Sequence, residues 1–296
     1  MPYLAPEIHY CTAADGYRFA VRRWPTSNPP ARAVVIHGIV SHGGWYLSTC
    51  RHLARLGVEV HAPDRRGSGL NMAARGDARH WATWLDDVEL YVNALDQQIP
   101  TVLIGISWGG KLVAALARRN RLPLAGIVLI GPGLYAQQQP GPLKRSLLRA
   151  AVAAGAGRRR VTIPLADPAL FTDTPRWKDY IRDDPFTLRR VTMRFALADL
   201  ALNAYARAAA EHLTSPTLLM LAGRDRIVDN GRTHRFFERI AAPDKTCIEY
   251  PDAGHTLEFE PDPSLYLNDL ASWIQGRSRK AEGAGDGSEE GVEEGN

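Results

Sequence analysis

Short apolar runs alternate with longer amphipathic segments along most of the chain, and this rhythm constrains the fold more than any other feature. Runs such as 101–106 (TVLIGI) are typical of buried strands, and the segments between the runs have helical spacing. Strands separated by helices form a parallel sheet covered on both faces, so we predict an α/β fold. We expect strands at 7–13, 17–24, 32–37, 58–61, 101–106, 124–130, 217–221 and 246–250. We expect core helices at 45–56, 80–97, 108–119, 232–240 and 264–274.

The alternation stops over residues 134–212, which are rich in helix formers. Helical spacing recurs there at 143–154 and 188–211. A loop of this length without its own structure is uncommon in a compact domain. We therefore expect 134–212 to be a helical cap, inserted between two parts of one α/β core, 1–133 and 213–276. The cap should lie over the C-terminal edge of the sheet, where open α/β sheets bind ligands.

Composition excludes several classes of protein. The chain of 296 residues is 45% hydrophobic, which is ordinary for a globular protein and excludes disorder throughout. No apolar run approaches the roughly 18 residues that span a bilayer. Three cysteines, Cys11, Cys50 and Cys247, are too few and too scattered for a disulfide framework or a zinc site. The N-terminus lacks the features of a signal peptide, so we expect a cytoplasmic protein.

The net charge of +4 conceals an acidic tail. Residues 281–296 carry six acidic side chains and no basic one, so the rest of the chain carries a net charge of +10. The tail is rich in Gly and poor in apolar residues, and we expect 277–296 to be disordered. Much of the basic surplus lies in 134–212, which has thirteen Lys/Arg against seven Asp/Glu, with its densest cluster at 158–160.

The segment GISWG (105–109) matches G-x-S-x-G and lies between an expected strand and an expected helix. A serine at such a turn is strained, and the flanking Gly105 and Gly109 remove side chains that would clash. The hydroxyl then projects above the sheet beside the positive end of the helix, so we expect Ser107 to be a nucleophile on a nucleophile elbow. The segment also fits the start of the phosphate-binding loop G-x-x-x-x-G-K, but that motif continues with Ser or Thr, whereas this chain has Leu112.

A serine nucleophile needs a base and an acid, which in hydrolases with this turn follow in the order serine, acid, histidine. Asp225 and His255 each follow an expected strand, at the sheet edge where Ser107 is exposed. We expect His255 to accept the serine proton and Asp225 to orient the imidazole and stabilise the imidazolium. Asp229 and Asp252 are nearby alternatives to Asp225, although Asp229 is better explained as a helix cap.

Acyl transfer also needs hydrogen-bond donors for the oxyanion. The expected donors are the backbone N–H groups of Trp108, which follows the nucleophile, and of Ile39, in the loop after an apolar strand. Gly38 allows that loop to turn sharply. His37 and His42 lack metal-binding spacing, so we expect them to line or stabilise the same loop, and we expect neither a metal nor a cofactor.

Five segments together resemble the α/β-hydrolase superfamily, and more narrowly its monoacylglycerol lipase and lysophospholipase-like branch, which overlaps serine aminopeptidase-like sequences. They are HGIVSHGGWY (37–46), DRRGSG (64–69), GISWGG (105–110), LAGRDRIVDN (221–230) and DAGHTLEFE (252–260). The resemblance covers about residues 7–275 and implies a mostly parallel, doubly wound sheet of about eight strands with a helical cap. Two positions depart from the branch: Ser68 stands where the branch often has His, and Trp108 where it often has Met or Gln.

The resemblance implies a serine hydrolase that acts through an acyl-enzyme on Ser107. Its implied substrate is a carboxylic ester of a lipid-like small molecule, such as a monoacylglycerol or a lysophospholipid. Other acyl chemistry on the same residues stays open, namely that of a peptidase, thioesterase, acyltransferase or C–C hydrolase. A non-catalytic binding protein with this fold also stays open, as does the oligomeric state.

The basic cap raises the question of further partners. Leu143 and Leu147 repeat at helical spacing beside Lys144 and Arg145, a combination found in helices that lie on anionic membranes. The same pattern is typical of a cap helix that packs its apolar side inward, which is the more common arrangement. A transient contact of the cap with an anionic membrane is therefore an expectation to test. Nucleic-acid binding is not expected, because the chain has no recognition module.

Overall fold

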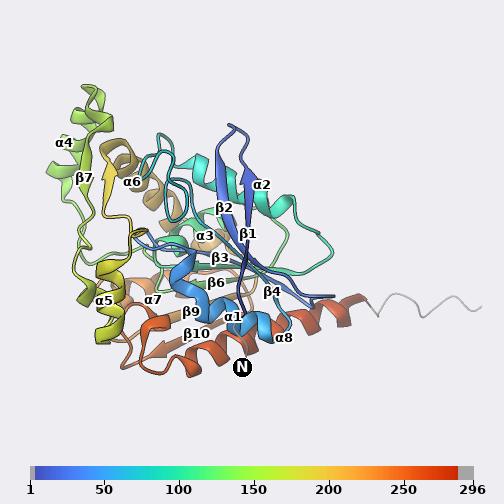
Figure 1. The fold of residues 1–296 in the computed structure, drawn as a ribbon. Coiled ribbons are helices and arrows are strands. Elements are labelled where there is room, and N and C mark those ends of the chain that lie inside the picture. The colour runs from blue at the N-terminus through green and yellow to red at the C-terminus, as the bar shows by residue number, and fades with distance from the viewer. Residues whose placement is uncertain (1–3, 286–296) are drawn as a thin grey trace, which may run out of the picture.

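The computed structural model describes residues 4–285, and its centre is an eight-stranded sheet in the order β1-β2-β4-β3-β5-β6-β9-β10 (Figure 1). The strands from β4 to β10 in this order are parallel, and β1 and β2 are antiparallel at one edge. This arrangement confirms the predicted α/β class. The strands are β1 (Glu7–Thr12), β2 (Arg18–Trp24), β3 (Arg32–Ile36), β4 (Glu59–Pro63), β5 (Thr101–Ile106), β6 (Leu124–Ile130), β9 (Thr217–Ala222) and β10 (Lys245–Tyr250).

Helices cover both faces of the sheet. Every residue of β3 and β5 is buried, which explains why these strands are continuous apolar runs rather than alternating ones. Figure 1 shows α1 and α8 together on one face, where they contact each other, and α2 and α3 on the other. The core helices are α1 (Leu47–Arg55), α2 (Ala82–Asn93), α3 (Trp108–Arg119), α7 (Asn230–Glu238) and α8 (Ser264–Gly285).

The C-terminal boundary of the core lies later than the sequence predicts. Disorder is predicted from 277 onward, whereas α8 continues to Gly285. Its extension contains Lys280, Ala281 and Glu282, which are good helix formers, and the glycine-rich part of the tail begins only after them. The remainder of the acidic tail, 286–296, lies outside the described residues. Within residues 4–285 no helix is both long enough and apolar enough to cross a membrane.

The cap segment, residues 134–212, packs against loops that follow the parallel strands. The Leu188 N–H donates to the Val40 carbonyl, and the Thr256 N–H donates to the Phe171 carbonyl. The segment contains strands as well as helices: α4 (Pro142–Ala153), β7 (Arg160–Thr162), α5 (Pro175–Asp183), β8 (Arg190–Thr192) and α6 (Met193–Arg207). Short 3-10 turns complete the fold at η1 (Gly43–Tyr46), η2 (Ala156–Arg158), η3 (Pro168–Leu170), η4 (Ala210–His212) and η5 (Leu257–Phe259).

The expectation of a purely helical cap is therefore incomplete. The helix predicted at 188–211 begins only at Met193, because the Thr192 side chain caps it by accepting the Phe195 N–H at 3.1 Å. The residues before it form β8, which pairs antiparallel with β7. Each of these strands has three residues, too few to show a period of two in the sequence.

Candidate active site

Ser107 lies in the turn between β5 and α3, and both elements have the boundaries that the sequence predicts. Its φ of 53° is in the left-handed region, which residues other than Gly rarely adopt. A Cβ at Gly105 would lie 2.6 Å from the Gly109 carbonyl oxygen, and one at Gly109 would collide with the Ile36 carbonyl. The Gly133 N–H donates to the Ser107 carbonyl at 2.7 Å. Close packing without side chains at the two glycines therefore holds the serine in this strained turn.

The structure brings Ser107, His255 and Asp225 together in one line of hydrogen bonds. His255 Nε2 lies 2.9 Å from Ser107 Oγ, and His255 Nδ1 lies 2.7 Å from Asp225 Oδ2. The side chains of His255 and Asp225 are only 3% and 1% exposed, so water competes little for these bonds. Asp225 Oδ1 accepts the Ile227 and Val228 N–H groups at 2.7 and 2.8 Å, which fixes the carboxylate. This geometry suits transfer of a proton from the serine to the histidine.

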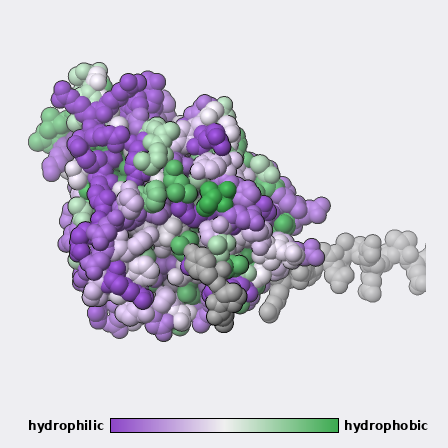
Figure 2. All heavy atoms as spheres, in the orientation of Figure 1, coloured by the Kyte–Doolittle hydropathy of each residue, from purple (hydrophilic) through white to green (hydrophobic). Residues whose placement is uncertain are grey.

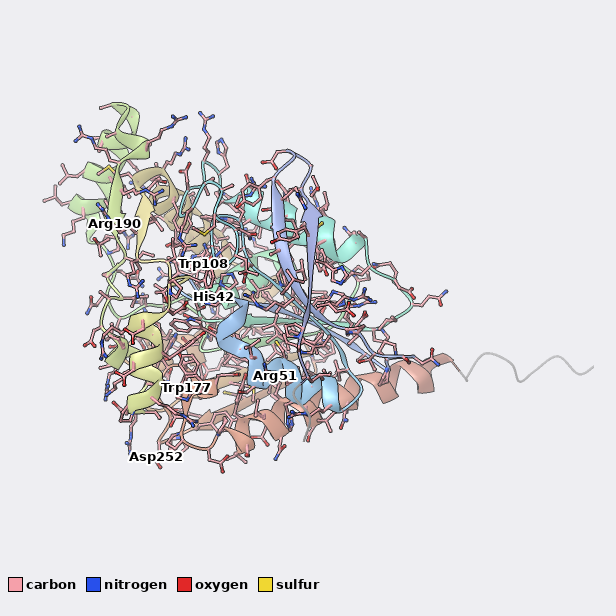
Figure 3. The ribbon with its side chains drawn as sticks, in the orientation of Figure 1. His42, Arg51, Trp108, Trp177, Arg190 and Asp252 are labelled. Carbon is pink, nitrogen blue, oxygen red and sulfur yellow. The ribbon has the colours of Figure 1, made fainter. Side chains whose placement is uncertain are left out.

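The two alternative carboxylates have other partners. Asp229 caps α7 by accepting the Arg232 N–H at 2.9 Å, as its position in the sequence predicts. The Asp252 side chain is 83% exposed and forms an ion pair with Arg224. Figure 3 shows Asp252 at the periphery of the molecule, away from Trp108. Asp225 is therefore the carboxylate that contacts His255.

The two expected oxyanion donors lie beside Ser107. Trp108 is the first residue of α3, where a backbone N–H has no partner within the helix. Ile39 belongs to the β3 loop, residues 37–46. This loop passes close to Ser107: a Cβ on Gly38 would lie 3.4 Å from Ser107 Cβ. Ile39 and Ser107 line the same cavity. This arrangement can stabilise negative charge on the carbonyl oxygen of a group bound at Ser107.

The cavity at Ser107 is small. Its volume is ≈ 10 Å³, at the limit of what one water molecule needs. Two side chains of the cap segment, Leu165 and Phe171, line it beside His255. A second cavity of ≈ 80 Å³ shares Val40 and Leu165 with the first and extends beneath the cap segment. Leu165 and Phe171 thus bring the cap segment against Ser107, which is itself partly exposed.

His37 and His42 stabilise opposite ends of the β3 loop. His37 Nδ1 lies 2.8 Å from the Gly38 carbonyl oxygen. Burial lowers the pKa of His37 to about 3, so its imidazole is neutral near pH 7. His42 Nε2 lies 3.0 Å from Asp184 Oδ2 in the cap segment. Figure 3 shows His42 and Trp108 at the side of the sheet that faces the cap segment.

Three polar residues near the site are not predicted from the sequence: Arg65, Asp184 and Asp199. Asp199 is on α6, and its Oδ1 accepts hydrogen bonds from Trp108 Nε1 at 2.6 Å and from Lys111 Nζ at 2.8 Å. Asp199 thus ties Trp108, the residue after Ser107, to the cap segment. Only Arg65 could have been suspected from the sequence, because it lies within the DRRGSG motif. Asp184 and Asp199 lie outside the five motifs.

Comparison with known proteins places the chain in a family. The family profile described as Serine aminopeptidase, S33 matches residues 27–262. The monoacylglycerol lipase of Mycolicibacterium smegmatis is 26% identical over 273 residues, covering 90% of this chain and 96% of that protein. Phospholipase YtpA of Bacillus subtilis is 28% identical over 247 residues, covering 81% of this chain and 93% of that protein.

A solved structure shares the fold. The crystal structure of a soluble variant of monoglyceride lipase from Saccharomyces cerevisiae, in complex with a substrate analog, has a TM-score of 0.81 at 21% identity, covering 93% of this chain and 96% of that chain. This likeness confirms the predicted α/β-hydrolase fold. The relatives confirm the resemblance to the monoacylglycerol lipase-like branch. The chain therefore belongs to the serine aminopeptidase S33 family of α/β-hydrolases.

Proposed function

We propose that this chain is a serine hydrolase that cleaves a carboxylic ester of a lipid-like substrate, a monoacylglycerol or a lysophospholipid, through an acyl-enzyme on Ser107. The line of hydrogen bonds from Ser107 through His255 to Asp225 carries the proposal. The relatives named monoacylglycerol lipase and phospholipase, which match most of the chain, support the substrate class.

Each residue has a defined part in the proposed reaction. His255 Nε2 accepts the proton of Ser107 as its Oγ attacks the ester carbonyl, while the N–H groups of Ile39 and Trp108 donate to the oxyanion. His255 then gives this proton to the leaving alcohol, and the acyl group stays on Ser107. A water molecule, deprotonated by His255, attacks the acyl-enzyme, and the carboxylic acid leaves as Ser107 regains its proton. Asp225 stabilises the imidazolium in both steps, and the reaction needs no cofactor.

The walls around Ser107 favour an ester with an acyl chain. Ile39, Val40, Leu165 and Phe171 are apolar side chains that line the cavity at the serine. Apolar walls suit the burial of an acyl chain. None of the residues that line this cavity is acidic, whereas the substrate of an aminopeptidase carries a free amino group that an acidic side chain would bind. We therefore place a lipid ester ahead of a peptide as the substrate.

A substrate panel tests the proposal. The protein and its Ser107→Ala variant are assayed on p-nitrophenyl esters of increasing chain length, on monooleoylglycerol, on lysophosphatidylcholine and on aminoacyl amides. We expect ester hydrolysis that rises with chain length, little cleavage of the amides, and a loss of at least about 10⁴-fold in Ser107→Ala. Faster cleavage of the amides would replace the proposal by a peptidase. An absence of turnover on the whole panel would favour a binding protein.

Helix α4 is the surface through which we propose a transient contact with an anionic membrane. None of its residues is buried, and Leu143 and Leu147 are 73% and 60% exposed. Figure 2 shows hydrophobic surface at the corner where Figure 1 places α4, next to hydrophilic surface. Exposed leucines beside Lys144 and Arg145 are typical of helices that enter the boundary of an anionic bilayer.

Vesicle binding tests this contact. The double variant Leu143→Ser/Leu147→Ser should bind vesicles with an anionic lipid more weakly than the unmodified protein, because it removes apolar area from the contact. Leu265→Ser is the matched control, since Leu265 is 65% exposed on α8. Equal binding by the double variant and the control would contradict the proposed contact.

We also propose that the protein works in the reducing cytoplasm. Cys11, Cys50 and Cys247 are all free in the structure, and disulfides are rare in that compartment. Cells lysed directly into denaturant with an alkylating agent should yield a chain with all three thiols modified, including the buried Cys50. Recovery of a disulfide under these conditions would contradict the proposed compartment.

A further inference from the structure

Arg65 is a buried cation, and among residues 4–285 its guanidinium has no direct acidic partner. The residue is only 7% exposed, and its Nε and Nη1 have no hydrogen-bond partner in the part of the chain that the structure describes. Asp64 and Asp199 attract it without a direct hydrogen bond. A buried charge without a paired partner is costly, so its place in the fold needs a reason.

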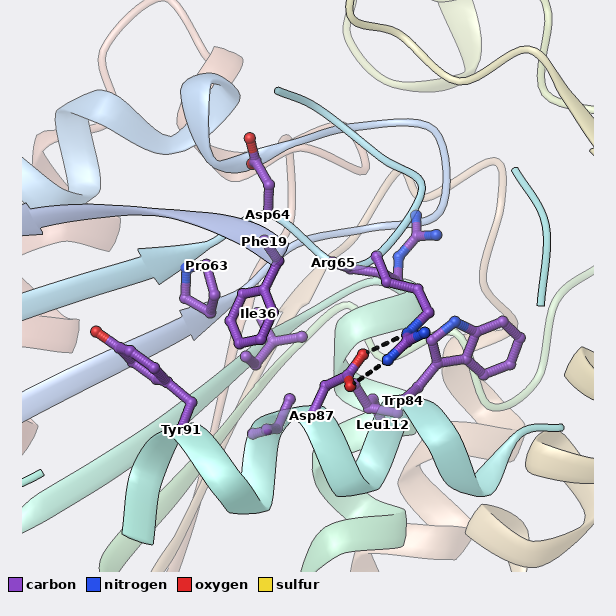
Figure 4. A pocket seen from close by; sticks show the side chains of 11 residues that line it. Phe19, Ile36, Pro63, Asp64, Arg65, Trp84, Asp87, Tyr91 and Leu112 are labelled. Atoms are coloured by element: carbon purple, nitrogen blue, oxygen red, sulfur yellow. Dashed lines mark hydrogen bonds and ion pairs between the residues drawn. The ribbon is translucent and has the colours of Figure 1, made fainter. Parts of the chain in front are cut away.

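The neighbouring Arg66 shows the contrast. Arg66 Nε and Nη2 donate to the two carboxylate oxygens of Asp87 at 2.7 and 2.6 Å, in a small cavity behind the active site. In Figure 4 the guanidinium of Arg65 is turned away from Asp87. Arg66 is thus an ordinary arginine in an ion pair with Asp87, whereas the guanidinium of Arg65 does not pair with that carboxylate.

The guanidinium of Arg65 contacts the β3 loop. Its Nη2 donates to the Ile39 carbonyl at 2.6 Å and to the Gly38 carbonyl at 3.2 Å. The backbone N–H of Arg65 also donates to His37 Nε2 at 3.0 Å. Because that nitrogen accepts, Nδ1 of His37 carries the hydrogen and donates to the Gly38 carbonyl at 2.8 Å. The Gly38 carbonyl is therefore held by two donors, and Arg65 positions both of them.

Holding the Gly38 carbonyl also orients the N–H of Ile39. The two groups belong to one planar peptide unit, and the described residues contain no cis peptide bond. In a trans unit the N–H points opposite to the C=O, so a carbonyl fixed toward Arg65 directs the Ile39 N–H away from Arg65. The same peptide unit lies beside Ser107, since Gly38, Ile39 and Ser107 line one cavity and a Cβ on Gly38 would lie 3.4 Å from Ser107 Cβ.

The same guanidinium also packs against Trp108, whose backbone N–H is the second proposed oxyanion donor. It stacks on the ring of Trp108, 4.7 Å from the ring centre, and lies 5.8 Å from the ring centre of Phe195 on α6. At its edge the indole of Trp108 is also held by the hydrogen bond from Nε1 to Asp199. A planar guanidinium can stack on an aromatic ring while it donates in its own plane, which a lysine ammonium cannot do.

We propose that Arg65 is a positioning residue for the oxyanion site, which aligns the Ile39 and Trp108 N–H groups by holding the β3 loop and the Trp108 ring together. This inference rests on the proposed function, because it assigns a part in the same reaction. Arg65 does not touch the substrate. It acts through the two backbone groups that contact the oxyanion, and its uncompensated positive charge adds to the field in which that oxyanion develops.

The test separates transition-state stabilisation from folding. Arg65→Met keeps an unbranched apolar stem at this position and removes the donors and the charge of the guanidinium. On p-nitrophenyl butyrate we expect kcat to fall by about 10- to 100-fold with little change in KM. Affinity for a trifluoromethyl ketone, which forms a tetrahedral adduct with an oxyanion, should fall by a similar factor. Arg66→Met is the matched control and should change thermal stability without lowering kcat or ketone affinity.

Arg65→Lys keeps the test decisive if Arg65→Met fails to fold. It retains the charge but not the planar fork, so we expect a smaller loss, about 3- to 10-fold, in both kcat and ketone affinity. A variant at position 65 that folds and keeps the kcat and ketone affinity of the unmodified protein would overturn the inference. If the proposed function itself fails, the unmodified protein will neither hydrolyse the ester nor bind the ketone, a result distinct from any effect at position 65.

Discussion

His42 and Asp184 lie 142 residues apart in the chain and are joined by a buried hydrogen bond of 3.0 Å between Nε2 and Oδ2. Asp184 Oδ2 also accepts from Trp45 Nε1 and from Thr187 Oγ1, each at 2.8 Å. Although burial acts to raise it, the pKa of Asp184 is held well below its usual range by the hydrogen bonds from His42 and Trp45. One carboxylate thus joins the β3 loop, which carries the proposed oxyanion donor Ile39, to the cap segment.

Removing the charge of Asp184 should loosen this junction. We expect Asp184→Asn to lower the free energy of unfolding by about 2–4 kcal/mol at pH 7, because buried donors lose a charged acceptor. The lowered pKa means that this contribution is present at neutral pH and is lost only as the pH falls below about 4. Asp183→Asn, at the exposed neighbouring position, is the control. Urea unfolding curves that coincide for the two variants would contradict the junction.

Activity measurements test which carboxylate, among Asp225, Asp229 and Asp252, assists His255. Asp225→Asn should lower kcat by roughly 10⁴-fold, because an amide neither holds the imidazole in the required tautomer nor stabilises the imidazolium. Asp252→Asn should keep the activity of the unmodified protein, since its side chain is exposed and paired with Arg224. Both variants are assayed on the same short ester. A large loss in Asp252→Asn with little loss in Asp225→Asn would reverse the assignment.

Acid should destabilise the fold partly through His37. Its pKa is about 3 in the fold and about 6.5 in an unfolded chain, so the unfolded chain binds the proton first. The stability from the neutral imidazole is complete above about pH 6.5 and is lost as the pH falls toward 3, amounting to a loss of about 2 kcal/mol at pH 5.

The variant His37→Asn isolates this group. Between pH 7 and pH 5 its free energy of unfolding should fall by about 2 kcal/mol less than that of the unmodified protein. Other buried groups, such as His61, whose pKa is also lowered by burial, contribute to both proteins alike. Denaturant titrations at the two pH values measure the difference. Parallel losses of stability would show that His37 does not titrate as described.

The basic cluster 158–160 should raise hydrolysis at an anionic interface but should not affect hydrolysis in free solution. Replacing its three arginines by glutamine should weaken action on anionic micelles by about tenfold or more, because each arginine near such a surface contributes about 1 kcal/mol. Hydrolysis of a short soluble ester should be unchanged. High salt should reduce the difference, since it screens exposed charges. An equal loss on both substrates would leave the cluster without an interfacial role.

Elements whose pattern lies within consecutive residues are predictable from the sequence, whereas contacts between distant residues are not. The boundaries of β5 and α3 match their prediction because a fully buried strand and a helix meet at a glycine-flanked serine, and each has a clear pattern. Strands β7 and β8 escape prediction because their pairing joins residues far apart in the chain and each is too short to show a period. Asp199 has no local signal, since its contact with Trp108 spans 91 residues. Arg65 has the motif around it, but the direction of its side chain depends on Trp108 and on the β3 loop.

Covalent labelling tests most directly whether Ser107 is the nucleophile. The protein is treated with a fluorophosphonate probe, and the modified residue is identified by intact mass and peptide mapping. We predict one adduct per chain, on Ser107, with no labelling of Ser107→Ala and slow labelling of His255→Ala, because His255 removes the serine proton. Labelling of another residue, or labelling that persists in Ser107→Ala, would contradict the account.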